Sequence, residues 1–381
     1  MDFTISEDLR QIQQTIRTYV HERLLPLSEQ VEQEDRIPDE VIAEMAAIGL
    51  FGVPFPKEYG GLGAGLLGFC LALEELGAAN AAFANIVGPH VQIGAMAIYL
   101  DGSEEQKRKY MTDLATGRRL AAFALTEAEA GCDAANIQTT AVRRGDSFIL
   151  NGRKQWISNG AIAEVFSVFA VTDKTLRAKG GITAFIVEKS YPGFRVGKLE
   201  ALMGLRGSHP TELFFEDCVV PADNVLGREG FGFATAMKTL DVGRVAIGAS
   251  AVGSAQRLLE LCIDHSKQRV QFGRPIAANQ AIQWMLADIA TEIDAARWMT
   301  HHAAWKSDQG QRYTRDAAMV KLFATDMLGR VADRAVQIFG GRGYSKEYPI
   351  ERFYRDARIL RIYEGTNEVQ RLVIAGDLLK G

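Results

Sequence analysis

The 381-residue sequence predicts an α+β multidomain protein. It has an N-terminal helical domain (1–120), a central antiparallel β-barrel or sandwich (121–231) and a C-terminal four-helix bundle (232–381). Three observations favour this fold class. The length corresponds to two or three domains of about 150 residues. Apolar residues recur with the helical period at both ends of the chain and with the strand period in the middle. Helices do not alternate with the strands, so a parallel nucleotide-binding sheet is not expected.

The N-terminal domain carries the periodicity and the start signals of helices. One face of the first predicted helix holds four apolar residues, Leu9, Ile12, Ile16 and Val20. Pro38 suits the first turn of a second helix. Ser103 and Gln106 have the spacing of a capping box, which predicts that another helix begins there.

The longest uncharged run, Leu76–Leu100, is long enough to cross a membrane. It also holds polar residues such as Asn80 and Gln92, and it is interrupted by Pro89. We therefore predict two buried helices with a break near Pro89, and no membrane insertion.

The middle domain shows runs typical of strands. Apolar strands are predicted at Phe166–Val171, Ile182–Val187 and Leu213–Val220. The pairs Asn151–Gly152 and Asn159–Gly160 are typical of tight hairpin turns.

After Gly230 the helical period returns. Long helices are predicted at about 232–270, 278–308 and 313–339, followed by a last segment after Pro349. These four pieces are the predicted bundle.

Composition excludes several classes of protein. The net charge of −4 gives no basic excess for nucleic acid or an anionic membrane surface. The cysteines at 70, 132, 218 and 262 form no C-x-x-C pair, so neither a disulfide framework nor a zinc site is predicted. With no signal-peptide pattern at the N-terminus, we expect a cytoplasmic protein, or one of the mitochondrial matrix after processing.

Familiar catalytic motifs are absent from the sequence. It has no Walker P-loop, no G-x-G-x-x-G after a strand, no G-x-S-x-G and no H-E-x-x-H. A metal site or a serine or cysteine hydrolase is therefore not predicted.

Four segments together have a specific resemblance. They read ALTEAEAGCDAA at 124–135, NGRKQWISNG at 151–160, RVQFGRP at 269–275, and QIFGGRGY with YEGTNEVQR at 337–344 and 363–371. In order and spacing they resemble the motifs of the FAD-dependent acyl-CoA dehydrogenases, in the short- or medium-chain-like branch. The resemblance extends over essentially the whole chain.

The resemblance implies FAD bound between the barrel and the C-terminal helices, reaching into a neighbouring subunit. It also implies α,β-dehydrogenation of a saturated acyl-CoA to the trans-2-enoyl-CoA, with hydride transfer to flavin N5. Glu364 of YEGT matches the catalytic base of the family, and burial can raise the pKa of such a base toward neutrality. A family variant carries its base just before the arginine of LDxxR, but here that position is Gly243.

The same resemblance assigns two sets of binding residues. The cofactor-binding residues are Phe123, Leu125, Thr126, Gly131, Cys132, Trp156, Ile157, Ser158, Arg269, Phe272, Gln280, Gln337, Gly340, Gly341, Thr366, Asn367 and Glu368. The substrate-binding residues are Cys132, Asp241, Arg244, Tyr363 and Gly365.

Several positions depart from the family pattern or allow two interpretations of the residue's role. Ala128 and Glu129 replace the usual proline and glycine, and Cys132 replaces a serine that contacts the CoA side. Glu129 either charges the acyl-CoA entrance or is a solvated loop residue. His90 lines the acyl pocket or is a hydrogen-bonded core histidine. The stripe Arg352, Arg355, Arg358 and Arg361 is interpreted as scaffold ion pairing with Asp356 and other acids.

The implied partners are an acyl-CoA substrate and an electron-transfer flavoprotein, and the implied assembly is a homotetramer, a dimer of dimers. Two alternatives remain open at this point. One is a flavin-dependent oxidase or monooxygenase on the same scaffold, and the other is a non-catalytic acyl-CoA-binding protein.

Overall fold

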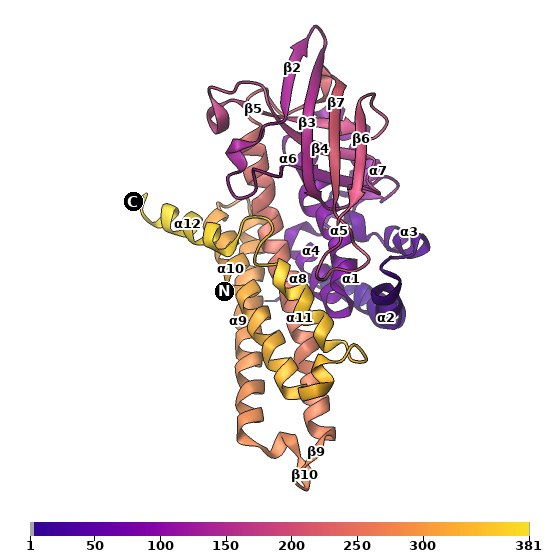
Figure 1. Cartoon of the computed structure of the whole chain (residues 1–381), viewed down its shortest axis with the longest axis vertical. Coiled ribbons are helices and arrows are strands. Elements are labelled where there is room, and N and C mark those ends of the chain that lie inside the picture. The colour runs from indigo at the N-terminus through magenta and orange to yellow at the C-terminus, as the bar shows by residue number, and fades with distance from the viewer. Residues whose placement is uncertain (1–3, 381) are drawn as a thin grey trace.

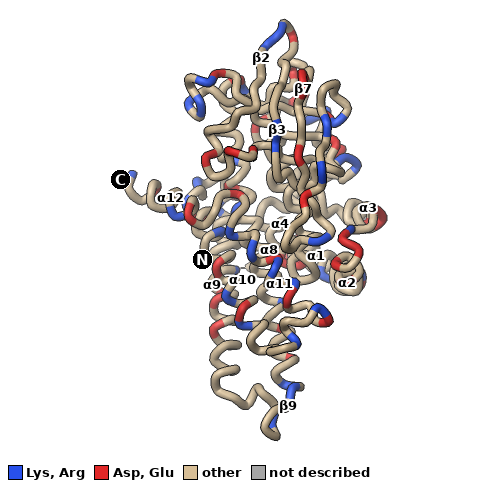
Figure 2. The backbone as a smooth tube through the Cα atoms, in the orientation of Figure 1, with Lys and Arg blue, Asp and Glu red and all other residues tan. Residues whose placement is uncertain are grey.

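The computed structural model describes residues 4–380. Helices come first, a sheet follows, and long helices end the chain, so the predicted fold class is confirmed. Figure 1 shows the sheet at the top, the N-terminal helices at one side, and the C-terminal helices running down as a long bundle. Acidic and basic residues are interspersed over all three parts (Figure 2), in keeping with the small net charge.

The N-terminal part consists of short helices. They are α1 (Glu7–Tyr19), η1 (Val20–Leu24), α2 (Leu25–Glu34), α3 (Asp39–Ala47), η2 (Leu50–Gly52), η3 (Lys57–Tyr59), α4 (Gly65–Ala79), α5 (Ala81–Gly88), η4 (Pro89–Ala95), α6 (Met96–Asp101) and α7 (Glu104–Ala115). The predicted capping box starts α7. Ser103 Oγ accepts from the Gln106 N–H, and Gln106 Oε1 accepts from the Ser103 N–H.

The predicted break at Pro89 is wrong. The chain breaks at Asn80, whose extended backbone and side-chain bond to the Ala82 N–H (2.9 Å) start α5. At Pro89 the helix continues as the wider π-helix η4, which tolerates a residue without an N–H. The segment Ala81–Asp101 is long and apolar enough to cross a membrane, yet 94% of its most apolar window is buried inside the protein. We therefore interpret it as a core helix.

Within the described residues, eight strands form one sheet in the order β6-β7-β3-β2-β4-β5-β8, with β1 paired to β4. They are β1 (Ala121–Ala124), β2 (Thr140–Arg144), β3 (Ser147–Ile157), β4 (Val165–Val171), β5 (Ile182–Glu188), β6 (Phe194–Leu199), β7 (Thr211–Pro221) and β8 (Val225–Leu226), with short 3₁₀ turns η5 (Ala134–Asn136), η6 (Arg177–Lys179) and η7 (Ala222–Asn224). Most pairings are antiparallel, as predicted, but β4 pairs in parallel with β1 and with the first residue of β2.

One predicted turn is wrong, and the other is a turn but not a hairpin turn, since the strands on either side of it, β3 and β4, do not pair with each other. Asn151 and Gly152 lie inside β3, where the register against β7 shifts between Leu150 and Gly152. The Asn151 amide bonds Asp217 across the strands, which supports this irregularity. Asn159 and Gly160 do form a turn, with Asn159 in the left-handed region at φ 59°.

The C-terminal part follows the predicted helix bounds to within about two residues. It contains α8 (Gly232–Gln268), β9 (Val270–Gln271), β10 (Arg274–Pro275), η8 (Ile276–Ala278), α9 (Gln280–Asp308), α10 (Thr314–Phe339), η9 (Gly340–Tyr344), α11 (Ile350–Ile359) and α12 (Asn367–Leu378). In Figure 1, α8–α11 run along the bundle and α12 projects sideways. The predicted last segment is thus two helices, and the turn between them carries the YEGT motif.

Close packing of α4 against α8 joins the N-terminal part to the bundle. A Cβ atom at Gly253 would lie 1.9 Å from the backbone oxygen of Glu74, so only glycine allows the helices to approach this far. This contact fixes the two helical parts around the space beneath the sheet.

Candidate active site

A cavity of about 900 Å³ lies where the sheet, the helices α5 and η4, and the bundle meet. Its lining combines apolar side chains with a few polar groups, as ligand sites commonly do. It brings together many of the predicted residues: Phe123, Leu125, Thr126, Gly131, Cys132, Trp156, Ile157, Ser158, Arg244, Tyr363, Glu364, Gly365 and Thr366.

Glu364 lies on the turn between α11 and α12, and its carboxylate has two unlike oxygens. Oε1 accepts a hydrogen bond from Gln92 Nε2 at 2.8 Å. Oε2 is buried and has no hydrogen-bond partner among residues 4–380. Burial raises the pKa of Glu364 to about 7, against the smaller lowering effects of Gln92, Arg244 and Lys321. A carboxylate with such a pKa and one free oxygen is suited to act as a general base.

Gly243 on α8 provides the space for this carboxylate. A Cβ atom there would lie 1.9 Å from Glu364 Oε2. Positions 243 and 364, the two alternative positions of the catalytic base in the family, are therefore neighbours in space. A side chain at position 243 would occupy the space that the Glu364 carboxylate now fills.

Three non-glycine residues that line the cavity have left-handed backbone, and one of them is Leu205 at φ 56°. Glu364 has a φ of 53° and Trp156 a φ of 60°. Such conformations cost of order 1 kcal/mol and gather at functional sites. Trp156 is the last residue but one of β3, beside a register shift, and the residue remains 49% exposed on the cavity.

A buried ion pair supports the loop 125–132 beside Trp156. Lys154 is wholly buried on β3, and its Nζ donates to Leu125 O (2.9 Å) and to Glu127 Oε1 (2.7 Å). Glu127 also accepts from the backbone N–H groups of Gln138 and Thr139. The pair thus ties the loop with Thr126 to the strand with Trp156.

Comparison with known proteins agrees with this geometry. Family models of acyl-CoA dehydrogenase match three successive segments: the N-terminal domain at residues 6–118, the middle domain at 122–218 and the C-terminal domain at 230–379. The chain belongs to the acyl-CoA dehydrogenase family.

Individual relatives match along their full length. A short-chain-specific acyl-CoA dehydrogenase of Clostridium acetobutylicum is 43% identical, with 100% of each chain covered. The butyryl-CoA dehydrogenase structure from Megasphaera elsdenii is 43% identical with a TM-score of 0.97, again over 100% of each chain. A chain of the solved structure described as the electron transferring flavoprotein of Acidaminococcus fermentans is 46% identical with a TM-score of 0.98 over 100% of each chain.

The protein is therefore an enzyme of an FAD-dependent oxidoreductase family, and the cavity fits that cofactor. A flavin ring is planar, with apolar faces and polar edges. The cavity offers the indole of Trp156, the hydroxyls of Thr126 and Ser158, and backbone groups of the loop 125–132. These residues would hold the ring system.

Eight predicted cofactor residues lie outside this cavity. Asn367 and Glu368 are described below, and the other six are Arg269, Phe272, Gln280, Gln337, Gly340 and Gly341. Phe272 stands fully exposed in the β9–β10 hairpin, at the far end of the bundle from the sheet (Figure 1). Gln280, Gln337 and the two glycines are also exposed. Their contact with the FAD of a neighbouring subunit, which the resemblance implies, stays a prediction.

Asn367, Glu368 and Asp241 do not line the cavity, contrary to the expected direct contacts with cofactor and substrate. Asn367 is buried, with its amide bonded to Lys321, Thr325 and Asp326. Glu368 is exposed in the first turn of α12. Asp241 is held by Arg244 Nη1 (2.8 Å) and by Thr314 Oγ1 (2.7 Å), so it orients the arginine that does reach the cavity.

The structure shows where two of the residues that depart from the family pattern lie relative to the cavity. Cys132 is exposed on the cavity, with Sγ 3.8 Å from Thr366 Oγ1, so the thiol stands beside the turn that carries Glu364. Glu129 is exposed and does not line the cavity, which agrees with a solvated loop residue.

His90 is a core residue and does not line the cavity. Its Nε2 bonds Leu114 O and its Nδ1 accepts from the Ala121 N–H. Burial lowers the pKa of His90 to about 4, so the ring is neutral.

The arginine stripe is mostly scaffold, as predicted, but its partners differ. Arg352 bonds backbone carbonyls, Arg355 pairs with Glu32 and Glu351, and Arg361 with Asp326. Asp356 instead accepts from the Leu205 N–H, and Arg358 is exposed on the cavity.

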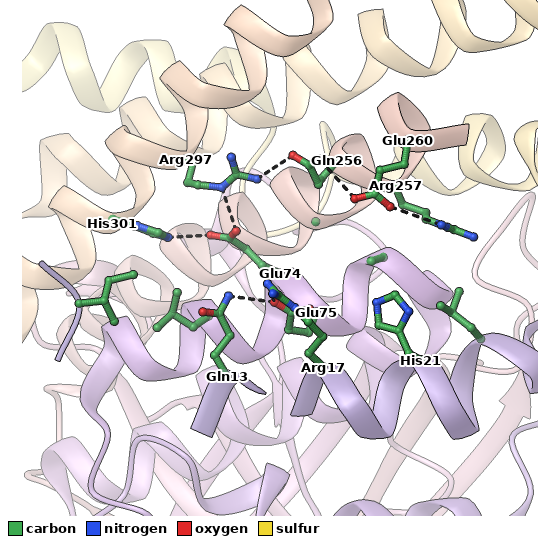
Figure 3. A pocket seen from close by; sticks show the side chains of 15 residues that line it. Gln13, Arg17, His21, Glu74, Glu75, Gln256, Arg257, Glu260, Arg297 and His301 are labelled. Carbon is green, nitrogen blue, oxygen red and sulfur yellow. Dashed lines mark hydrogen bonds and ion pairs between the residues drawn. The ribbon is translucent and has the colours of Figure 1, made fainter. Parts of the chain in front are cut away.

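A second cavity of about 430 Å³ lies between α1, α4, α8 and α9 and is lined by charges (Figure 3). Glu74 bonds both Arg297 (3.1 Å) and His301 (2.7 Å), while Glu75 bonds Gln13 and Arg17. Because these carboxylates are already paired, we interpret this cavity as an interdomain contact.

Sequence reasoning missed four residues of the site: Gln92, Lys154, Lys321 and Gln370. Gln92 was one of the polar residues inside the uncharged run, and Lys154 and Lys321 are charged residues at apolar positions of a strand and a helix. A polar residue at a core position is the signal that could have indicated them.

Proposed function

We propose that this enzyme oxidises a short-chain saturated acyl-CoA to the trans-2-enoyl-CoA and passes the electrons to an electron-transfer flavoprotein. The short chain is supported by the relatives named short-chain specific and butyryl-CoA dehydrogenase. The electron acceptor is supported by the match to a chain of the electron transferring flavoprotein structure.

The observation that carries the proposal is the buried carboxylate of Glu364 on the cavity, with one oxygen held by Gln92 and the other free. An α-proton next to a thioester is a very weak acid. Its removal needs a base with a pKa near the working pH and donors for the developing enolate oxygen.

The chain's own residues supply the proton chemistry. Glu364, when ionised, accepts the α-proton at Oε2, while Gln92 keeps Oε1 in place. The backbone N–H of Glu364 is the donor that the resemblance implies for the thioester oxygen. When bound, FAD supplies the acceptor for the β-hydrogen, which leaves as hydride so that the double bond forms. The base is shielded from bulk water, since its Oε2 atom is buried.

An anaerobic absorbance titration with acyl-CoAs of different chain length tests the proposal. We expect butyryl-CoA to bleach the flavin band most effectively, and the Glu364→Gln variant to keep its flavin but lose bleaching by at least about 10³-fold. Unchanged bleaching in Glu364→Gln would contradict the role of this base. Rapid turnover with oxygen as acceptor would favour the oxidase alternative.

The assembly follows the same proposal: a homotetramer built as a dimer of dimers. Support comes from two cofactor-type residues, the half-buried Arg269 and the exposed Phe272, and from the exposed Trp284 on α9, which a neighbouring subunit would cover.

A further inference from the structure

Lys321 is an ammonium group buried in α10 directly behind the turn that carries Glu364. Its side chain is wholly buried, and among residues 4–380 it forms no ion pair within 4.0 Å. Burying a charge without a carboxylate partner costs several kcal/mol unless hydrogen bonds replace the lost water. The hydrogen-bond partners of Nζ therefore indicate which part of the structure this charge supports.

Lys321 Nζ donates two hydrogen bonds, one to the YEGT turn and one to the first residue of α12, directly after the turn. It donates to Gly365 O at 2.8 Å and to Asn367 Oδ1 at 2.8 Å. The Asn367 amide then bonds Asp326 Oδ1 at 2.9 Å, which connects the ammonium to a carboxylate through one side chain.

Gln370 holds the same turn from α12. Its Nε2 donates to Gly365 O at 2.8 Å and reaches Glu364 O at 3.3 Å, while Arg244 Nε reaches Glu364 O at 3.5 Å. Two successive carbonyl oxygens are thus bonded by side chains from three helices.

The turn needs such support because its backbone is strained. Glu364 has a φ of 53° and Gly365 a φ of 88°, both in the left-handed region. A non-glycine residue holds this conformation only when its surroundings fix it. If the two carbonyls were released, the turn could relax and the carboxylate would leave its place beside Gly243.

We propose that Lys321 and Gln370 are positioning residues that hold the Glu364–Gly365 turn and thereby aim the base into the cavity. Lys321 adds a second effect, since its positive charge favours the ionised form of Glu364. This inference rests on the proposed role of Glu364 as base.

The charged groups around Glu364 make the charge effect testable. Arg244 on α8 and Lys321 on α10 lower the pKa of Glu364, and Gln92 on η4 is uncharged. Lys321 itself is also influenced by Asp326 and Glu368, and burial lowers its pKa to about 8. Removing the Lys321 charge leaves Arg244 as the cation near the base, so the pKa of Glu364 should rise further.

The experiment compares Lys321→Met, which removes charge and donor, with Gln370→Met, which removes a donor alone. The FAD-loaded variants are mixed anaerobically with butyryl-CoA, and the bleaching rate is followed between pH 5.5 and 9. We expect both to slow by roughly 10-fold or more, and the pH midpoint to rise by about one unit in Lys321→Met only. Lys174→Met is the matched control and should behave as wild type, since Lys174 is exposed between β4 and β5 and forms no ion pair within residues 4–380.

A second readout needs no substrate. The infrared band of the protonated Glu364 carboxyl, identified by its absence in Glu364→Gln, gives the same midpoint by pH titration, and we expect the same upward shift in Lys321→Met.

The results separate this inference from the proposed function. If wild type is not bleached by any acyl-CoA, the proposed function fails before any variant is compared. If wild type is bleached and Lys321→Met, with full flavin, matches its rate and both midpoints, the role of Lys321 is overturned. If Lys321→Met does not fold, Gln370→Met decides, because a wild-type rate in that variant overturns the role of the bonds to the turn.

Discussion

At the scale of single residues, burial and hydrogen bonding act on the Glu364 carboxylate in opposite directions. Burial is the larger effect and raises the pKa to about 7 from the ordinary 4.5. The base works only when ionised, so activity should rise as the pH rises through this value.

The bleaching rate with butyryl-CoA should therefore increase about tenfold per pH unit below the midpoint and level off above it, with the midpoint near pH 7. Stopped-flow absorbance between pH 5 and 9 measures this profile. A midpoint near 4.5, the ordinary value for Glu, would mean that the carboxylate is hydrated in solution.

A second prediction concerns Gly243, whose missing side chain leaves room for Glu364. Gly243→Ala would place a methyl group 1.9 Å from Oε2, so the carboxylate must move. We expect the bleaching rate to fall about 100-fold while flavin is retained, since a misplaced base costs rate more than cofactor binding.

Gly376→Ala is the matched control for this change. Gly376 lies in α12, and a Cβ atom there meets nothing within 4 Å. Its activity should equal that of wild type. Equal activity in Gly243→Ala would show that Glu364 does not need this volume.

At the scale of elements, β3 and the loop 125–132 are joined by the Lys154–Glu127 pair. Lys154→Met would leave the Glu127 carboxylate buried without its cation, which costs about 3–5 kcal/mol when one partner of a buried pair is removed. We expect a lower melting temperature and a smaller flavin-to-protein ratio.

The double variant Lys154→Met/Glu127→Gln separates the two effects. It removes the unpaired charge of Glu127, so much of the thermal stability should return. Leu125 O in the loop still lacks the hydrogen bond from Lys154 Nζ. Thermal unfolding and the flavin absorbance ratio measure both quantities. Full flavin retention in both variants would contradict a role of the pair in holding the loop.

Element bounds were predictable where local signals decide them. The capping box at Ser103 and the long apolar periods of α8–α10 gave starts and ends close to those observed. Pro89 and Asn151–Gly152 were misjudged because tertiary contacts override local preference. The helix continues through Pro89 as a π-helix, and β3 continues through Asn151, whose side chain bonds Asp217 on the neighbouring strand.

At the scale of the whole molecule, the far end of the bundle carries Arg269 and an exposed Phe272 that serve no purpose in the cavity of the same chain. If a neighbouring subunit's cofactor lies there, Arg269→Ala should lower flavin retention several-fold, because the guanidinium would no longer bind phosphate. Equilibrium dialysis against FAD, together with light scattering for the assembly, measures this effect. Wild-type retention in Arg269→Ala would contradict the shared site.

The sequence by itself determined the order of helices, sheet and helices, the FAD-dependent family and Glu364 as the candidate base, because period, turn chemistry and motif spacing are written in the chain. Tertiary structure alone decided how that base is held. Gln92, Gly243 and Lys321 lie far from Glu364 in the sequence and reach it or its turn only when the helices pack. Gln370 belongs to the same motif segment, but its bond to Gly365 O depends on how α12 follows the turn. Packing also left Asn367 and Asp241 outside the cavity lining, where Asn367 bonds Lys321 and Asp241 bonds Thr314.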